Sequence, residues 1–161
     1  MWPARPASAI ILGSIYFTKA AMDISYLITP LLTWLVVGPI KFLINSVRQR
    51  RWAFNLVGNG GFPSNHSAVV SSMATLIALR EGLDHPAFGV AATLAFIVMS
   101  DANSLRQHVG KHAAALNRFG TGTDGHVHLR ERMGHTLIEI GGGVCTGIAM
   151  GFALFHLFER F

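Results

Sequence analysis

The chain has 161 residues, the length of a single domain, and 51% of them are hydrophobic whereas only 13% are charged, against about 25% charged in ordinary soluble domains. These values exclude a disordered or collagen-like chain and favour a multi-pass membrane protein. The net charge of +5 suits anionic lipid head groups or phosphate-bearing substrates, and because no basic tail is present we do not expect nucleic acid as a partner.

The first two predicted elements are a short helix at the membrane interface and a membrane-spanning helix. Residues 6–18 form a short apolar run that contains Tyr16 and follows Trp2, and aromatic residues of this kind favour the head-group level. Residues 24–40 carry no charged side chain. They approach the length of about 17–25 residues that a helix needs to cross the hydrocarbon core.

Two further crossings are predicted in the middle of the chain. Residues 64–80 reach nearly spanning length if Arg80 extends its side chain to the head groups, and residues 85–100 again lack charged side chains. A polar tract follows at residues 102–135. Within it, residues 105–118 have an amphipathic pattern that predicts a helix.

The end of the chain predicts a loop and a last crossing. Residues 120–128 are polar and rich in glycine, whereas residues 140–158 are apolar and of spanning length. In this last helix Gly143, Gly147 and Gly151 form a face of small residues. Close packing within the chain is our preferred interpretation of this face, and a homo-oligomer contact is the alternative.

The predicted fold is one all-α integral-membrane domain over residues 1–161, with about four transmembrane helices. Four crossings place residues 42–63 and 102–135 on one side of the membrane and both termini on the other. Eight Lys and Arg residues lie on the first side and four on the second, which favours the cytoplasm for the first side.

The segment GGFPSNHS at residues 60–67 contains the first candidate functional residues. Ser64 or Asn65 can cap the helix that follows, and the N-terminus of a helix attracts a phosphoryl group. His66 can donate or accept a proton near neutral pH. A helix cap beside an incidental histidine is the alternative interpretation.

A second candidate pair, His135 and Glu139, begins the last apolar helix. Because the two residues are four positions apart, they lie on the same face of a helix. A carboxylate bound to one imidazole nitrogen fixes the tautomer and makes the other nitrogen a better nucleophile. The alternative is an ion pair at the membrane interface.

Three cations complete the candidate set. Lys41 and Arg48 are seven residues apart and therefore project from one face of a helix, and Arg106 begins the polar tract. Arginine presents a planar fork to phosphate oxygens, whereas lysine acts as a compact charge. Anchoring at the membrane interface is the alternative role for all three.

In order and type, these residues resemble the three-part signature of type-2 phosphatidic acid phosphatases. They are most similar to the small divergent branch of that family, which is related to acid phosphatases and vanadium-dependent haloperoxidases. The resemblance extends over residues 24–150 and includes Asp101, Gly110-Lys111 and Leu116-Asn117. It implies a helical membrane enzyme that removes phosphate from a lipid without a metal or another cofactor.

The resemblance also implies a role for each candidate. His135 attacks phosphorus and forms a phosphohistidine, Glu139 orients His135, and His66 protonates the leaving alkoxide. The groups that hold the phosphate oxygens are Lys41, Arg48, Ser64, Asn65 and Arg106. The implied substrates are glycerolipid phosphates, such as phosphatidylglycerophosphate or phosphatidate, and polyprenyl phosphates or diphosphates.

The sequence departs from the main family in spacing and in single residues. Gln49 replaces the proline that follows the arginine, so Arg51 is an alternative to Arg48. Between Arg106 and His135 there are 28 residues, where the main family has only a few. The site can form only if this tract folds back on itself.

Two other functions are alternatives. A non-catalytic binder or carrier of anionic lipid would use the same cationic pocket. A metal-dependent membrane hydrolase would use His108 and His112, with His126 and His128 as further ligands. We expect these four histidines to be ordinary polar residues of a helix and a loop.

Overall fold

The computed structural model describes residues 24–50, 61–122, 125 and 127–160, and all regular structure in this part of the chain is helical. The elements in chain order are α2 (Ile24–Gln49), α3 (Asn65–Glu81), α4 (Pro86–Ser100), the π-helix η2 (Asp101–Leu105), α5 (Arg106–Gly120) and α6 (Leu137–Phe158). The predicted all-α fold is therefore confirmed. The interfacial helix predicted at residues 6–18 lies outside the described residues.

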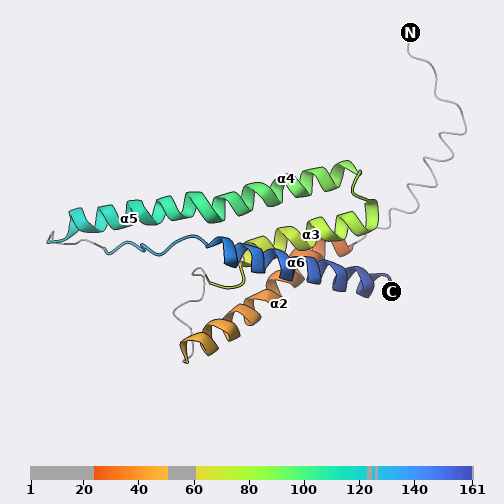
Figure 1. The fold of residues 1–161 in the computed structure, drawn as a ribbon, viewed down its shortest axis with the longest axis horizontal. Coiled ribbons are helices and arrows are strands. Elements are labelled where there is room, and N and C mark those ends of the chain that lie inside the picture. The colour runs from red at the N-terminus through yellow and green to blue at the C-terminus, as the bar shows by residue number, and fades with distance from the viewer. Residues whose placement is uncertain (1–23, 51–60, 123–124, 126, 161) are drawn as a thin grey trace, which may run out of the picture.

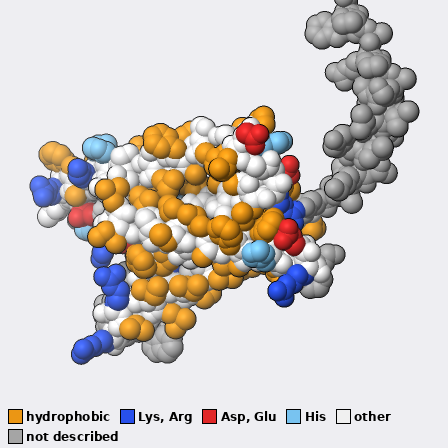
Figure 2. All heavy atoms as spheres, turned by 45° about the vertical axis from the view of Figure 1, so that its right-hand side comes forward, with side chains coloured by type: hydrophobic (Ala, Val, Ile, Leu, Met, Phe, Trp, Pro, Cys, Tyr) orange, Lys and Arg blue, Asp and Glu red, His pale blue; other side chains and the backbone are white. Residues whose placement is uncertain are grey.

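Among the described residues, three helical segments are long and apolar enough to cross a membrane: α2, α6 and the continuous run from α4 through α5. Large apolar side chains on their outer faces are exposed, among them Trp34, Val90 and Phe96. Figure 2 shows hydrophobic side chains over the middle of one face and Lys and Arg side chains towards its ends. The fourth predicted crossing is α3, a helix of 17 residues, and its path across the membrane stays a prediction.

The central helix of the bundle is α3, which packs against α6, α2 and α4 (Figure 1). Its contact with α6 is close because Gly143, Gly147 and Gly151 face its backbone and small side chains, where an added Cβ would clash. Packing within the chain, the preferred interpretation of the glycine face, is thus what the structure has. An oligomer contact of the chain stays a prediction.

Polar contacts hold α2 against α3. Thr33 is fully buried and its hydroxyl donates a hydrogen bond of 2.9 Å to Ser72 Oγ. At the opposite end from the candidate residues, the hydroxyl of Tyr26 donates to Glu81 Oε1 at 2.6 Å. Hydrogen bonds between helices replace water as the partner of these groups in a membrane-embedded bundle. They fix the position of α2, the helix that carries Lys41.

The amphipathic helix predicted at residues 105–118 is α5, but it is not a separate element. It continues α4 through the π-helix η2, so that a single helical rod runs from Pro86 to Gly120 over 35 residues, roughly 52 Å. Figure 1 shows α5 projecting beyond the other helices and the chain returning beside it to α6. This return determines the position of His135.

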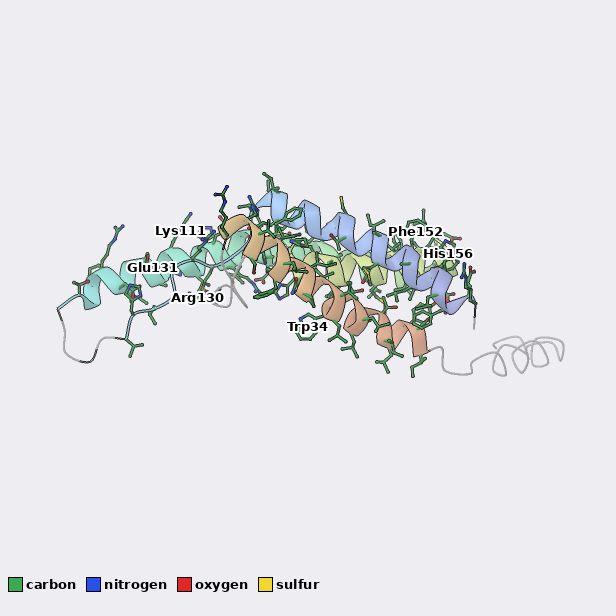
Figure 3. The ribbon with its side chains drawn as sticks, turned by 90° about the horizontal axis from the view of Figure 1, so that it is seen from below. Trp34, Lys111, Arg130, Glu131, Phe152 and His156 are labelled. Carbon is green, nitrogen blue, oxygen red and sulfur yellow. The ribbon has the colours of Figure 1, made fainter. Side chains whose placement is uncertain are left out.

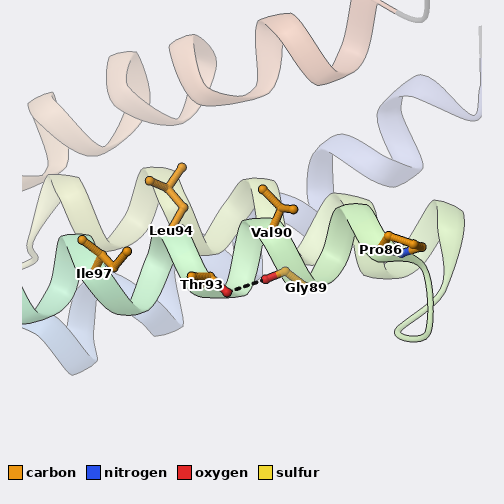
Figure 4. Close-up of a pocket in the computed structure, with 6 residues that line it drawn as sticks. All are labelled: Pro86, Gly89, Val90, Thr93, Leu94 and Ile97. Carbon is orange, nitrogen blue, oxygen red and sulfur yellow. Dashed lines mark hydrogen bonds between the residues drawn. The ribbon is translucent and has the colours of Figure 1, made fainter.

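A shallow apolar groove of about 450 Å³ lies along α4 (Figure 4). It is lined by Pro86, Gly89, Val90, Thr93, Leu94 and Ile97. None of the candidate functional residues lines it. Its apolar surface is of the kind that lipid chains cover in a membrane protein.

Candidate active site

The start of α6 places an imidazole against a carboxylate. Thr136 is the N-cap, and a capping box joins it to Glu139: the Glu139 N–H donates to Thr136 Oγ1 and the Thr136 N–H donates to Glu139 Oε2 at 3.0 Å. The same Oε2 lies 3.1 Å from Nδ1 of His135, whose side chain is only 6% exposed. Glu139 is therefore held by the first turn of α6, and it holds the His135 ring in turn.

This contact determines which nitrogen of His135 can react. An ionised carboxylate only accepts hydrogen bonds, so the contact assigns the proton to Nδ1 and leaves a lone pair on Nε2. Burial lowers the pKa of His135 below its ordinary value, and the nearby Lys41 and Arg106 lower it further, although Glu139 raises it. The imidazole is thus neutral at pH 7, the form that acts as a nucleophile.

His66 faces His135 from the first turn of α3. The two ring centroids are 6.4 Å apart and the ring planes are inclined at 64°. The starts of their helices are joined by a hydrogen bond of 2.9 Å from the Ser64 N–H to the Glu139 carbonyl. Attack on phosphorus requires an approach of about 3–3.5 Å and proton transfer one of about 2.6–3.2 Å, and the approach of both rings to one phosphoryl group stays a prediction.

The segment before α3 is anchored from two sides. The ring of Phe62 lies against Gly142 of α6, where an added Cβ would overlap it. Gly61 has a φ of +121°, and an added Cβ there would lie 2.9 Å from the Asn45 side-chain amide. Asn45 is buried in α2, four residues after Lys41. The sequence analysis missed Asn45, although its helical spacing from Lys41 is visible in the sequence.

A widened helical turn brings His135 to the rod. The N–H of Arg106 donates to the carbonyl of Asp101, five residues earlier, instead of to Ala102 as an α-helix requires. The carbonyl of Ala102 is consequently available, and it accepts a hydrogen bond of 2.8 Å from the His135 N–H. The π-turn therefore supplies the carbonyl that accepts the hydrogen bond from the His135 backbone.

The tract between Arg106 and His135 folds back through contacts made by α5. The Asn117 amide donates to the Leu129 carbonyl and accepts from the Leu129 N–H, both at 2.8 Å. Gly110 leaves room for the backbone of Glu131, which passes directly over it. In Figure 3 the returning residues Arg130 and Glu131 lie beside α5, which carries Lys111.

A further bond closes the tract at its other end. Nε2 of Gln107 donates to the His135 carbonyl at 3.1 Å. The condition that the spacing imposed, a return of the chain to Arg106, is thus met in the structure. The sequence analysis assigned no role to Gln107, because a glutamine on a polar helix has no distinguishing pattern.

Two cations and two carboxylates surround the imidazole pair. Lys41 and Arg106 both act electrostatically on His66 and His135. Arg106 Nε donates a hydrogen bond of 3.0 Å to Asp101 Oδ2, and both side chains remain partly exposed. His66, His135, Lys41 and Arg106, with the starts of α3 and α6, are called the cup below. Helix N-termini and basic side chains are groups that can bind an anion.

Arg48 is exposed in the last turn of α2. Seven residues of α-helix carry it about 10 Å along the axis from Lys41, and its role as a phosphate ligand stays a prediction. Arg51, the alternative candidate, lies outside the described residues.

Ser64 and Asn65 lie at the edge of the cup with different surroundings. The Ser64 side chain is fully buried, and its hydroxyl accepts hydrogen bonds from the N–H and the hydroxyl of Ser67. It therefore caps α3, and its role as a phosphate ligand stays a prediction. Asn65 Oδ1 is buried and has no hydrogen-bond partner among the described residues.

The histidines of the metal-dependent alternative are not gathered into a ligand set. Within the described ranges, no three His, Cys, Asp or Glu side chains are grouped so that they could hold a metal ion. His108 and His112 are exposed on α5. His128 lies near Asn117, and His126 is outside the described residues.

Comparisons with known proteins show the family of the chain. The model of the family described as "Divergent PAP2 family" matches residues 22–150. A protein of Bacillus subtilis (strain 168), named as the uncharacterized membrane protein YuiD, is 33% identical over 136 residues, which cover 74% of this chain and 84% of the relative. No solved structure matches the chain. The family match includes every candidate site residue.

Proposed function

Because the chain belongs to the divergent PAP2 family of membrane proteins, we propose that it is a metal-independent phosphatase that hydrolyses a lipid phosphate through a phosphohistidine. The observation that carries the proposal is the contact between His66 and His135, whose ring centroids are 6.4 Å apart, with Lys41 and Arg106 acting electrostatically on both rings. Phosphoryl transfer depends mainly on positioning and on charge stabilisation, and this cup offers both.

The reaction proceeds in two displacement steps. His135 Nε2 attacks phosphorus, the bond from phosphorus to the lipid oxygen breaks, and His66 gives its proton to the leaving alkoxide. A water molecule then attacks the phosphohistidine, His66 takes a proton from that water, and the nitrogen–phosphorus bond breaks to release inorganic phosphate. Lys41 and Arg106 stabilise the charge on the phosphoryl oxygens in both steps. Glu139 stabilises the His135 ring, as its 3.1 Å contact with Nδ1 supports.

The proposed substrates are membrane lipids with a terminal phosphate. They comprise glycerolipid phosphates, such as phosphatidylglycerophosphate or phosphatidate, and polyprenyl phosphates or diphosphates. The exposed apolar faces of α2 and α4 support a substrate that arrives within the bilayer. The excess of Lys and Arg in the segments around the cup supports a cytoplasmic active face.

Release of inorganic phosphate from a panel of these lipids by the purified protein in nanodiscs tests the proposal. We expect turnover by the native protein and none by His135→Ala or His66→Ala. His156→Ala is the matched control, because His156 is an exposed histidine near the far end of α6 and should leave turnover intact. Labelled phosphate should be trapped on the native protein, but not on His135→Ala.

The competing function is a non-catalytic binder of anionic lipid. It predicts that no lipid of the panel is hydrolysed and that lipid binding persists in both histidine variants. That combination would overturn the phosphatase proposal.

A further inference from the structure

Asp101 and Arg106 are joined twice across the π-turn. The backbone N–H of Arg106 donates to the Asp101 carbonyl, and the Arg106 Nε–H donates to Asp101 Oδ2 at 3.0 Å. In a regular α-helix, residues five apart point in directions that differ by about 140°. The wider turn of η2 therefore brings these two side chains together, and π-turns of this kind are frequent at functional sites.

The contact through Nε orients the rest of the guanidinium group. A guanidinium has five N–H donors in one plane, and the bond to Asp101 uses the donor nearest the side-chain stem. The terminal Nη groups are left to bind an anion in the same plane. Arg106 acts electrostatically on both imidazoles, which supports a position of its guanidinium near the two rings.

The exposure of the pair argues against a purely structural role. The side chains of Arg106 and Asp101 are 40% and 33% exposed, and ion pairs in such positions contribute little to the stability of a fold. The fixed orientation has a larger effect on recognition, because a guanidinium with a fixed plane binds phosphate oxygens through two parallel bonds.

We infer that Asp101 is a positioning residue, which holds the Arg106 guanidinium so that its terminal nitrogens bind the phosphoryl oxygens between His66 and His135. The inference rests on the proposed phosphatase function, but it concerns a residue that itself contacts neither imidazole. On this inference, Arg106 recognises a terminal phosphate through two parallel hydrogen bonds, and Asp101 of η2 sets their direction.

The experiment is a double-mutant cycle of Asp101→Asn and Arg106→Ala, assayed by lipid hydrolysis and by equilibrium binding of inorganic phosphate. For Asp101→Asn we expect a decrease in phosphate affinity and in kcat/KM of roughly 10- to 100-fold, the equivalent of one charge-assisted hydrogen bond. The double variant should be no worse than Arg106→Ala alone, because Asp101 acts through Arg106. Asp84→Asn, in the exposed turn between α3 and α4, is the control and should leave both quantities unchanged.

Two results would overturn the inference. One is an Asp101→Asn protein with native phosphate affinity and native kcat/KM, and the other is a double variant in which the two losses simply add. If no lipid is hydrolysed but Asp101→Asn still weakens phosphate binding through Arg106, the positioning role holds and only the proposed phosphatase function fails. Thermal unfolding of each variant in detergent separates loss of fold from loss of orientation.

Discussion

Nδ1 of His135 and Oε2 of Glu139 lie 3.1 Å apart, and the same carboxylate oxygen accepts the backbone N–H that begins α6. One side chain therefore caps a helix and orients an imidazole. The two roles can be separated by substitution, because Thr136 takes part only in the cap.

Glu139→Gln should decrease turnover by a factor on the order of 10²–10⁴, since the neutral amide no longer stabilises the correct tautomer and its charge. Thr136→Ala should instead cost about 1 kcal/mol of stability through the lost cap and leave turnover nearly native. Steady-state kinetics and thermal unfolding measured on both variants check the separation. Equal loss of turnover in the two variants would contradict it.

The pH dependence of turnover should follow the lowered pKa of His135. The imidazole is neutral at pH 7, so the contribution of His135 to kcat/KM should be fully present there and should decrease as the pH falls through a value below 6.5. The folded protein binds this proton less readily than the unfolded chain, so stability also decreases below about pH 6.5.

In Glu139→Gln the acid limb should move to still lower pH, because the carboxylate that raises the pKa of His135 is gone. Activity profiles over the acid range give the pH of the acid limb. Chemical shifts of labelled histidine in detergent give the pKa of His135. A limb that moves to higher pH would show that another group controls the reaction.

Gly110→Ala should separate the return segment from α5. An added Cβ would overlap the carbonyl of Glu131, so we expect a loss of about 1–3 kcal/mol and a marked decrease in turnover. Gly89→Ala is the matched control, because Gly89 is also helical and has nothing within 4 Å of an added Cβ. Proteolysis of residues 121–135, compared in the two variants, should be faster only in Gly110→Ala.

Gly147→Ala should weaken the α3–α6 contact without changing the oligomeric state. Its Cβ would clash with the backbone of Ala68, whereas Gly141 on the same helix has open space. We expect Gly147→Ala to unfold at a lower temperature and Gly141→Ala to be as stable as the native protein or slightly more stable. A change of mass in detergent for Gly147→Ala alone would indicate that the glycine face serves an oligomer.

The sequence predicts those features that depend on local patterns. The apolar runs correspond to α2, α4 and α6, and the cap at Ser64 begins α3 as expected. The pair His135 and Glu139 meets because helical spacing alone brings residues four apart together.

Features that depend on tertiary contacts could not be predicted. The residues Asp-Ala-Asn-Ser-Leu at positions 101–105 show no pattern that distinguishes a π-turn from an α-turn. The hydrogen bond between Asn117 and Leu129 joins positions that are twelve apart in the sequence, and neither helical nor strand periodicity relates such positions.

The hydrogen bond between Ala102 and His135 has a consequence for the chain that lies between them. Ala102 and His135, the two ends of this tract, are hydrogen-bonded to each other. The length of the tract between them therefore does not set the distance between His66 and His135. Loop-closure entropy grows only slowly with length, and loop tips accept grafted segments. Exchange of residues 121–126 for an epitope should therefore leave any phosphatase activity at the native level, and an antibody against the epitope would report on which side of the membrane this segment lies.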